Sequence, residues 1–559
     1  MKTITNLQSK LTMLAASVLL SSAAFSQARV QIIHNSADAA TQTVDIYAGT
    51  TLLLDDFQFR TASPFIDVAA GTVPIGIAPG NSSSSADVLA TFPLTVVDGE
   101  TYVAIANGIL SGSGYAPAPG VTVDVYALGQ EQANTVGNTD VLVFHGSTDA
   151  PTVDVSTPGG SAMPLVDDAS YGDFAGYLEL PTNDYTLNVT DATGATVVKS
   201  YSAPLSTLGL QDAAIVVVAS GFLDPSMNSN GDAFGLWVAL PTGGALVELP
   251  EATSRLQIIH NSADALAAEV DIYLNGTLLL DDFAFRTATP FVDVPAEVEN
   301  SIAVAPSNST SVAMAVATVP ATFSVNETYI AIANGIISPT GYAPATAFSL
   351  DVFEGAREAS AVTGNTDVLV FHGSTDAPTV DVDEATAGNL VDNAAYSNFA
   401  GYLELGTADY TLQVKDDAGA ANLFQYSAPL ATLNLQDAAI TVVASGFVDP
   451  SVNSNGANFG LWVALPAGGA LVELPTSTLS VKEFEKDLNI FPNPTTGQFQ
   501  INGIENGSNI EIYDMTGKVV MSEIINNTQI LSLEGFKSGT YMLSIQTAEQ
   551  KIIKKIALQ

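Results

Sequence analysis

The sequence predicts an all-β protein made of four tandem antiparallel β-sandwich domains, arranged as two duplicated pairs, and a smaller C-terminal β-sandwich. Two observations support this fold class. The stretch TDVLVFHGSTDAPTVDV at 139–155 recurs letter for letter at 366–382, with looser copies at 29–46 and 255–272. Between the copies, short runs that alternate apolar and polar residues are separated by turn residues roughly every 8–12 positions, as is typical of strands.

The four histidines of the chain occupy the same place in the four copies and define the repeat. They are His34, His145, His260 and His372, spaced by 111, 115 and 112 residues, so each repeat is a whole domain rather than one coil of a solenoid. Units one and two match units three and four at offsets of 225–227, which indicates duplication of a two-domain block. We expect units at 29–133, 134–250, 251–360 and 361–475, a linker at 476–486 and a C-terminal domain at 487–559.

The first unit begins with a β-rich run at 29–34, which is broken by a turn at 35–39 and followed by a strand at 44–47. In the third unit the matching strand leads to Asn275-Gly276, whose tolerance of positive φ predicts a two-residue hairpin. Alternating segments at 57–68 and 283–294 predict half-buried strands, and further strands are expected at 71–79, 90–97 and 102–109. Six or seven short strands in roughly 100 residues indicate an Ig-like sandwich.

The second and fourth units share the stretches GYLEL, YTL, LQDAAI and FGLWVALP. The apolar run at 213–223 is too short to span a membrane and predicts a buried strand. Trp237 and Trp462 lie between apolar neighbours in FGLWVALP, which favours a role in core or inter-domain packing over sugar stacking.

The body of the chain is strongly acidic. Residues 28–475 hold seven basic residues against 49 acidic ones, and the whole chain has a formal charge of −42. Such a body repels phosphate backbones, which excludes nucleic acid as a partner, and it favours a role of the charge in solubility. The chain has no cysteine, which excludes disulfides, thiol catalysis and thiolate metal sites.

The N-terminus predicts export. Residues 1–28 combine Lys2 and Lys10 with an apolar stretch at 11–25 and a small-residue cleavage pattern, as a secretory signal peptide does. No other segment reaches the roughly 18 apolar residues that a transmembrane helix requires.

The repeat motif itself raises the question of catalysis. Each copy places His, Ser and Asp within five residues, at a strand end where a nucleophilic relay is hard to build. The favoured interpretation is structural, with Ser and Asp bonding backbone amides in the turn and His anchoring the strand end through its ring nitrogens. The residues are His34, Ser36, Asp38, His145, Ser147, Asp149, His260, Ser262, Asp264, His372, Ser374 and Asp376.

Two kinds of metal site remain as alternatives. A motif histidine could combine with Asp38 and Asp45, or with Asp149 and Asp154, although one histidine per unit does not suit zinc. The loops at 224–232 and 449–458 resemble calcium loops, but they offer mainly Asn and Ser, which favours a turn. Calcium therefore stays a possible cofactor, no other cofactor is indicated, and the acidic pairs at 55–56 and 281–282 are expected to be solvated hairpin acids.

The C-terminal segment contains a set of Pro, Gly and aromatic landmarks followed by a basic tail at Lys551, Lys554 and Lys555. The landmarks are Pro492, Asn493, Pro494, Gly497, Ile512, Tyr513, Asp514, Gly517, Lys518, Val519, Gly539, Thr540 and Tyr541. With these residues the segment resembles the type A sorting domain of the type IX secretion system of Bacteroidetes. The resemblance implies a small Ig-like sandwich that the outer-membrane machinery recognises and usually removes, with release of the cargo or its attachment to surface polysaccharide. It also implies a route through the periplasm to the cell surface or medium.

The four body units resemble the bacterial family of domain of unknown function 4397. The resemblance rests on the opening His-x-Ser-x-Asp-Ala, the following Val-Asp-Val or Val-Asp-Ile, and the closing Phe-Gly-Leu run. It implies an extracytoplasmic β fold and no established activity. The sequence thus predicts a secreted or surface-displayed non-enzymatic protein acting in adhesion or surface structure; the alternatives are a glycan- or calcium-binding module and, more weakly, a hydrolase.

Overall fold

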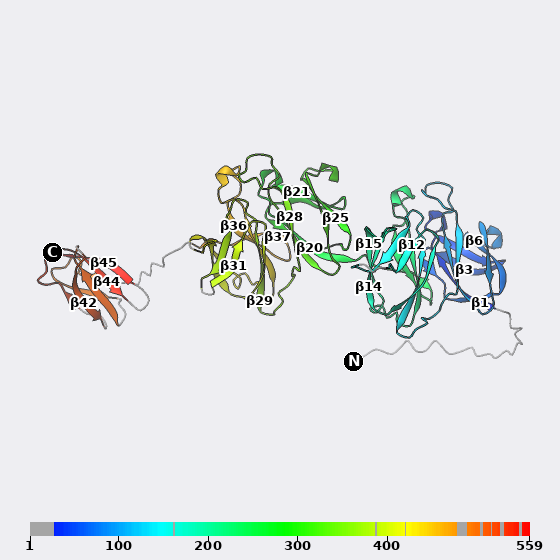
Figure 1. Cartoon of the computed structure of the whole chain (residues 1–559), viewed down its shortest axis with the longest axis horizontal. Helices are drawn as coiled ribbons and strands as arrows, with labels where there is room; N and C mark the ends of the chain where they lie inside the picture. The colour runs from blue at the N-terminus through cyan, green and yellow to red at the C-terminus, as the bar shows by residue number, and fades with distance from the viewer. Residues whose placement is uncertain are drawn as a thin grey trace. The chain divides into compact units, whose positions relative to one another are not determined.

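The computed structural model describes residues 27–159, 163–385, 388–419, 421–477, 489–502, 507–515, 517–525, 530–546 and 551–559. These residues form strands, joined by loops and by 3-10 turns of three residues each (Figure 1). The chain divides into two compact parts, Met1–Pro475 and Thr476–Gln559. The predicted all-β class is confirmed, whereas the expected signal peptide lies, except for its last two residues, outside the described residues, as does most of the expected linker.

Each unit of the first block consists of two sheets. The first unit has the sheet order β4 (Thr61–Ala62), β1 (Gln27–His34), β8 (Thr101–Asn107), β9 (Thr122–Ala127), with β5 (Ile66–Ala69) also on β1, and a second sheet β3 (Thr51–Gln58), β2 (Thr43–Ala48), β6 (Gly71–Pro79), β7 (Ala90–Val96). The second unit has β13 (Phe174–Pro181), β10 (Asn138–His145), β16 (Ala214–Ser220), β17 (Gly235–Ala239), β19 (Val247–Glu248), and β12 (Val166–Ala169), β11 (Val153–Ser156), β14 (Asp184–Asp191), β15 (Val197–Pro204).

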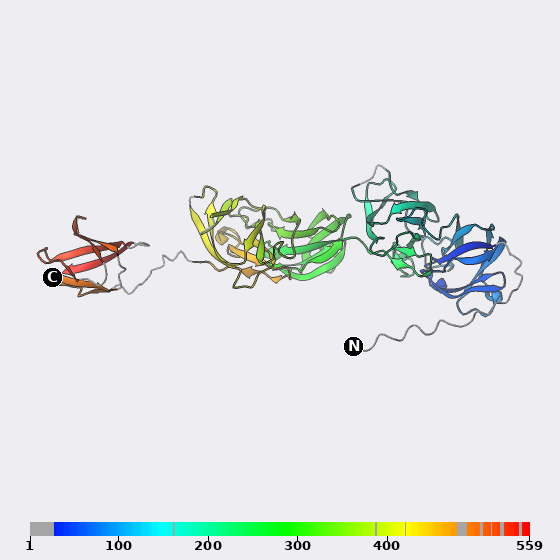
Figure 2. The ribbon, with the colours of Figure 1, turned by 90° about the horizontal axis from the view of Figure 1, so that it is seen from below.

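The second block repeats these orders strand for strand. The third unit has β28 (Ser349–Glu354), β27 (Thr328–Asn334), β20 (Thr253–His260), β23 (Thr287–Ala288), with β24 (Val292–Pro295) on β20, and β22 (Thr277–Ala284), β21 (Glu269–Leu274), β25 (Glu299–Pro306), β26 (Ala317–Thr322). The fourth has β32 (Phe399–Gly406), β29 (Asn365–His372), β35 (Ala439–Ser445), β36 (Gly460–Ala464), β38 (Val472–Glu473), and β31 (Gly388–Ala394), β30 (Val380–Glu384), β33 (Asp409–Asp416), β34 (Asn422–Pro429). The view in Figure 2 follows the same strands from below.

The strand that carries the motif has one parallel neighbour in every unit, which the sequence did not predict. β1 pairs with β8 in parallel, with Ile32 opposite Ala104, and β10, β20 and β29 pair in the same way with β16, β27 and β35. The parallel pairing is possible because the intervening chain crosses to the other sheet and returns, which supplies the long connection that parallel strands need. The other neighbouring strands in these sheets pair in antiparallel fashion, for example β1 with β4, β10 with β13 and β2 with β3.

Local sequence signals correspond closely to the observed elements. The predicted hairpin is confirmed, since Asn275 and Gly276 have φ of 51° and 82° between β21 and β22. The apolar run at 213–223 contains the buried strand β16. The segment 57–68, however, is broken between β3 and β4 by Arg60, which has a φ of 58°. Arg286 breaks 283–294 in the same way, with a φ of 60°.

The two units of a block share a hydrophobic core in addition to their own. In the first block this shared core joins Ile33, Phe65 and Ile105 of the first unit to Leu142 and Val218 of the second. β18 (Gly244–Ala245) of the second unit also pairs with β4 of the first, and β37 (Gly469–Ala470) pairs with β23 in the second block. Each block is therefore one continuous packed body rather than two separate beads.

The C-terminal part is a separate sandwich with its own core. Its sheets have the orders β39 (Asn489–Phe491), β40 (Gln498–Asn502), β43 (Ile530–Ser532) and β42 (Val519–Ile525), β41 (Ser508–Tyr513), β44 (Gly539–Gln546), β45 (Lys551–Leu558). Ile501, Ile512, Leu543 and Ile556 are fully buried between them.

Candidate functional site at the repeat motifs

The motif histidines lie at the ends of β1, β10, β20 and β29 and bind backbone carbonyls. Nε2 lies 2.6 Å from the Thr41 oxygen in His34 and 2.7 Å from the Ala267 oxygen in His260. In His145 and His372 it lies 3.0 Å from the oxygens of Pro151 and Pro378. A carbonyl accepts only, so Nε2 carries the hydrogen in all four rings and Nδ1 is an acceptor.

The other motif side chains bond within the turn, as Asp38 does to the Ala40 nitrogen and Asp264 to the Leu266 nitrogen, and they also bond to a distant segment. Each serine hydroxyl donates to a glycine carbonyl about 72 residues later, at 2.6–2.7 Å: Ser36 to Gly108, Ser147 to Gly221, Ser262 to Gly335 and Ser374 to Gly446. The aspartates accept two successive backbone amides from the residues that follow: Asp38 from Leu110 and Ser111, Asp149 from Leu223 and Asp224, Asp264 from Ile337 and Ser338, and Asp376 from Val448 and Asp449. The motif therefore fastens the end of the first strand of each unit to the loop after its parallel partner.

Burial sets the ionisation of these groups. It lowers the pKa of His34 and His260 to about 4, so both rings are neutral at pH 7. Burial acts to raise the pKa of Asp38 and Asp264, but hydrogen bonds led by those from Ser111 and Ser338 outweigh it and keep both pKa values below the usual value. The motif thus combines a neutral histidine with a charged, fully hydrogen-bonded carboxylate.

The geometry does not form a nucleophilic relay. Among the described residues, no hydrogen bond joins a motif histidine ring to a motif serine hydroxyl, and in the first and third units Nδ1 faces the Ser36 and Ser262 backbone nitrogens at 3.3 and 3.4 Å. Ser36, Ser147, Ser262 and Ser374 are at most 2% exposed. A hydroxyl that is buried and donates to a carbonyl is neither activated nor accessible to a substrate.

The two motifs of a block meet at the junction between its units. Asn35 Nδ2, next to His34, donates to the Gly146 oxygen at 3.2 Å and to Asn107 Oδ1 at 3.0 Å. Asn261 makes the same contacts with Gly373 and Asn334. Asn35 and Gly146 occupy the same position in their motifs, so this contact requires Asn in one copy and Gly in the other.

Arg60 and Arg286 also join the two units of their blocks, and the sequence alone did not single them out. Arg60 donates to the Ser220 hydroxyl and to the carbonyls of Ser220 and Ala233, and its guanidinium lies 4.0 Å from the centroid of the Trp237 ring. Arg286 makes the same set with Ser445, Asn458 and Trp462. Burial lowers the pKa of Arg286 to about 10, which still leaves it charged at neutral pH.

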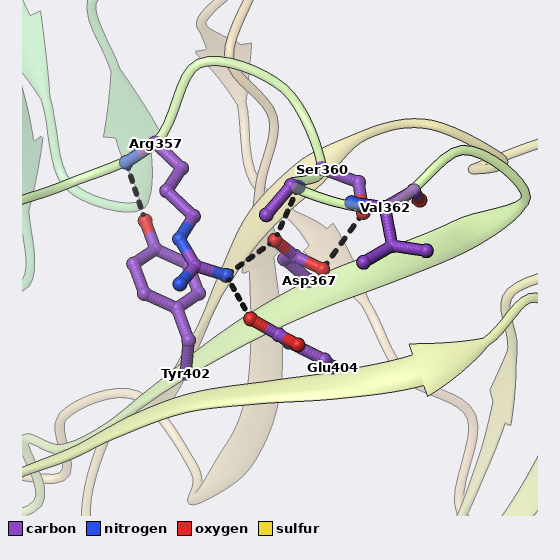
Figure 3. Close-up of polar contacts among 7 residues, drawn as sticks. Arg357, Ser360, Val362, Asp367, Tyr402 and Glu404 are labelled. Carbon is purple, nitrogen blue, oxygen red and sulfur yellow. Dashed lines mark hydrogen bonds and ion pairs between the residues drawn. The ribbon is translucent and has the colours of Figure 1, made fainter.

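The basic residues of the acidic body gather at the junctions. Arg29 and Arg255 contact Glu131 and Glu358, which lie between the last strand of their own unit and the first strand of the next. Four others contact a neighbouring unit: Arg60 with Ser220, Lys199 with Glu251, Arg286 with Ser445, and Arg357 with Asp367. Figure 3 shows the last of these, in which Arg357 lies 2.6 Å from Asp367, a fully buried side chain, and 2.8 Å from Glu404. Basic residues are rare in the body of the chain, and this rarity was the sequence signal that could have identified them as residues of the junctions.

The two loops that resembled calcium loops hold the junction together. Asn228, fully buried in the loop 224–232, donates to Asp149 Oδ2 at 3.0 Å and accepts from the Ala116 nitrogen of the first unit at 3.0 Å. Ser229 donates to the Gly114 oxygen, and the Tyr115 ring packs on Phe222. Asn453 and Ser454 repeat the polar contacts in the second block. Asn228 and Ser229, like Asn453 and Ser454, therefore use their side chains to bind protein groups across the junction.

One acidic cluster has the spacing of a cation site. Single oxygens of Asp271, Asp281 and Asp282 lie within 4.8 Å of one another. Asp271 Oδ1 accepts from the Asp282 nitrogen at 3.1 Å, and Oδ2 accepts from the Ser309 nitrogen and hydroxyl at 3.2 and 2.5 Å. Both carboxylate oxygens of Asp271 thus already accept hydrogen bonds from the protein. In the other three units, Asp45, Asp154 and Asp381 accept the equivalent hydrogen bond from a backbone nitrogen.

The residues of the sorting motif hold the last strand of the C-terminal part. Asn493, between Pro492 and Pro494, donates to the Lys555 oxygen at 2.8 Å and accepts from the Ala557 nitrogen at 2.9 Å. Tyr541 donates to the Lys537 oxygen. A turn brings Asp514 onto the backbone of Gly517 and Lys518, Gly497 lies against Glu534, and Gly539 begins β44. Lys554 and Lys555 are exposed.

Two family models match the chain. The C-terminal part matches the secretion system C-terminal sorting domain over 489–559. The domain of unknown function DUF4397 matches at 28–156, 139–224 and 254–383. The molecule is accordingly an exported β-sandwich repeat protein that the type IX system delivers to the cell surface or the medium. Its body belongs to the DUF4397 family. No described helix is long and apolar enough to cross a membrane.

The chain is also similar to solved structures at very low identity. One is the Bacillus anthracis TIE protein, with 9% identity, coverage of 78% of this chain and 68% of that one, and a TM-score of 0.12. Another is PorZ, a surface component of the type-IX secretion system of Porphyromonas gingivalis, with 12% identity, 91% and 71% coverage and a TM-score of 0.14. A third is the surface layer protein SbsC, domains 4–9, with 11% identity, 93% and 90% coverage and a TM-score of 0.11. No curated protein matches the chain.

Proposed function

We propose that the exported chain is a non-enzymatic structural protein of the cell surface, acting in adhesion or in a surface matrix, with surface polysaccharide as its partner. The observation that carries the proposal is the use of the motif groups. The hydroxyl of each motif serine and both oxygens of each motif aspartate are engaged in hydrogen bonds that hold a unit together. What the motif supplies is stiffness within a block, which suits a protein that must project from a surface.

The junction supports the same role. A block whose units share a core, a strand pair and a stacked arginine resists bending between its units more than two domains on a flexible linker. The acidic body favours a hydrated, mutually repelling surface. Duplication of the block then lengthens the chain without creating a new site.

The experiment separates structure from catalysis. The purified full chain is tested on chromogenic esters, peptides and polysaccharides, next to the Ser147→Ala/Ser374→Ala variant. We expect no turnover by either protein; hydrolysis by the wild type that the variant lacks would overturn the proposal in favour of a hydrolase.

A binding experiment tests the adhesive role directly. Beads coated with the full chain are applied to cells of the producing species and to its purified surface polysaccharide, with bare acidic beads of equal charge as the control. We expect retention of the protein-coated beads only. Equal retention of both kinds of bead would contradict adhesion, and saturable binding of one defined glycan on an array would favour the glycan-binding alternative.

A further inference from the structure

The second and fourth units each enclose an apolar cavity between their two sheets. The cavity measures about 70 Å³ in the fourth unit and about 60 Å³ in the second. In the first unit, two spaces lined by β1, β2, β6 and β8 residues measure only about 10 Å³ each. Protein interiors rarely leave voids of this size, so two matching cavities in duplicated units are a shared property of the even units.

The lining of the cavity in the fourth unit extends from the motif end of the unit to its opposite end. At one end the cavity is lined by His372 and Pro378 of the motif, and at the other by Leu405 and Tyr410, where β32 turns into β33. From Val368 to His372, both of which line it, β29 advances about 13 Å at roughly 3.3 Å per residue. Pro378 and Leu423 are exposed, so the lining reaches the surface.

The lining selects hydrocarbon. Apart from His372 and Tyr410, every lining side chain is nonpolar, and the Tyr410 hydroxyl already donates to the Gly406 oxygen. An apolar cavity of this kind stays dry and accepts nonpolar ligands. A group the size of a water molecule needs on the order of 10–15 Å³, so the cavity of the fourth unit holds about five to seven such groups, the size of a short alkyl chain.

His372 presents carbon atoms to this cavity. The residue is 3% exposed, its Nε2 donates to the Pro378 oxygen, and Nδ1 is buried. The wall of the cavity is therefore almost entirely apolar and offers no partner for the charge of a carboxylate.

We propose that the cavities of the second and fourth units bind the alkyl chain of a small uncharged molecule such as a short alcohol. The alkyl chain lies between the two sheets of the unit. This binding function is independent of the structural role, because it uses the interior of the even units and not the junctions.

The test uses the full chain and 1-hexanol, with binding followed by calorimetry. Ala203 and Ala428 are equivalent residues that line the two cavities, so Ala203→Leu and Ala428→Leu each fill one of them. We expect two sites in the wild type, one in each single variant and none in the double variant. Ala195→Leu, at an exposed position of the second unit, is the control and keeps two sites.

The selectivity is measured in Ala203→Leu, which leaves only the fourth-unit site. Hexanoate should bind there at least tenfold more weakly than 1-hexanol. Equal affinity for the two ligands would overturn the selectivity of the apolar wall for an uncharged ligand. Absence of saturable binding to the wild type, or unchanged binding to the double variant, would overturn the site itself. Melting curves check that the variants fold. Crystals of the wild type exposed to xenon provide a second measurement. Xenon density in both the second and the fourth unit supports the cavities, and xenon density in neither unit contradicts them.

Discussion

The guanidinium of Arg60 in the first unit stacks 4.0 Å from the ring of Trp237 in the second, and Arg286 stacks on Trp462 at the same distance. Each arginine also binds two backbone carbonyls across the junction. A partly desolvated cation on a tryptophan face contributes about 1–2 kcal/mol, and hydrogen bonds to a charged donor about 1.5–3 kcal/mol each. The arginine with its tryptophan and carbonyl contacts is therefore the strongest polar connection that we identify between the two units of a block.

Replacement of Arg60 should loosen the first block and leave the second unchanged. We expect Arg60→Ala to destabilise the first block by about 3 kcal/mol, because both the ring contact and the carbonyl bonds are lost. Arg60→Lys keeps the charge but not the planar fork, and should cost about half as much. Hydrogen exchange of β10 and β16 peptides measures the effect, with β29 and β35 as the internal reference; exchange unchanged in Arg60→Ala would contradict the role.

Gly146 should not tolerate a side chain. A Cβ there would lie 2.1 Å from Asn35 Nδ2 and 2.9 Å from the Ala219 oxygen. Gly146→Ala should therefore lower the stability of the first block by about 1–3 kcal/mol through overpacking. Gly112→Ala, where a Cβ would meet open space, is the control. In Asn35→Ala/Gly146→Ala part of the clash is removed, so calorimetry should show a smaller loss than the sum of the single variants; additive losses would contradict direct contact.

The sequence predicted the all-β fold class well, because a repeat and an alternating pattern report on each strand alone. The hairpin at Asn275 and the buried strand in 213–223 follow from local chemistry. The junction could not be predicted in the same way, because which unit covers a strand is a property of the assembled fold. One signal was present in Ile32 and Ile33, two adjacent apolar residues that break the alternation of this strand. The structure buries Ile32 inside the sandwich, and Ile33 packs in the core shared with the second unit. Strands covered on both faces have apolar residues at successive positions.

The motif shows a second limit of local reasoning. Ser36 and Asp38 were expected to bond amides within their own turn, and Asp38 does accept from the Ala40 nitrogen. Their other partners, Gly108 and Ser111, lie more than 70 residues away. A short sequence pattern identifies residues that need hydrogen-bond partners, but not the distant segment that supplies them.

Arg357 provides a natural comparison between the blocks. It forms an ion pair with the buried Asp367. Burial acts to raise the pKa of Asp367, but hydrogen bonds to its carboxylate, including the one from Arg357, keep this pKa below its usual value. The first block has Gln130 and Asp140 at these positions. Arg357→Gln should therefore destabilise the second block by about 1–2 kcal/mol, less than a fully buried pair would lose, since Arg357 is partly solvated. Calorimetry at low and high salt measures the change. Gln130→Arg is the reciprocal variant and should stabilise the first block; loss of stability in that variant would contradict the comparison.

Acid should weaken the first and third units in two separate pH ranges. The pKa values of His34 and His260 are about 4 in the folded chain against about 6.5 when unfolded, so the unfolded state binds more protons between these values. Stability should fall as the pH drops from 6.5 to 4, by on the order of 3 kcal/mol for each histidine. Asp38 and Asp264 have lowered pKa values, so their contribution is lost only below pH 4. Melting temperatures of the wild type and His34→Gln/His260→Gln across this range test the assignment, and an equal slope between pH 6.5 and 4 in both would contradict it.

Export should depend on the contact between Asn493 and the last strand. The side chain of Asn493 bonds the backbone at Lys555 and Ala557, so that the turn around Pro492 and Pro494 is fixed to β45. Loss of both hydrogen bonds costs about 1–3 kcal/mol and frees one end of the basic strand. In a host with a type IX system, deletion of 487–559 should retain the chain in the periplasm, and Asn493→Ala should reduce the exported fraction several-fold. The control is Asn502→Ala, whose exposed side chain accepts a hydrogen bond from the half-buried Gln500 and, within the described part of the chain, makes no hydrogen bond to β45. Fractionation of periplasm and medium provides the measurement. Wild-type export of Asn493→Ala together with retention of the deletion variant would show that recognition does not require this turn.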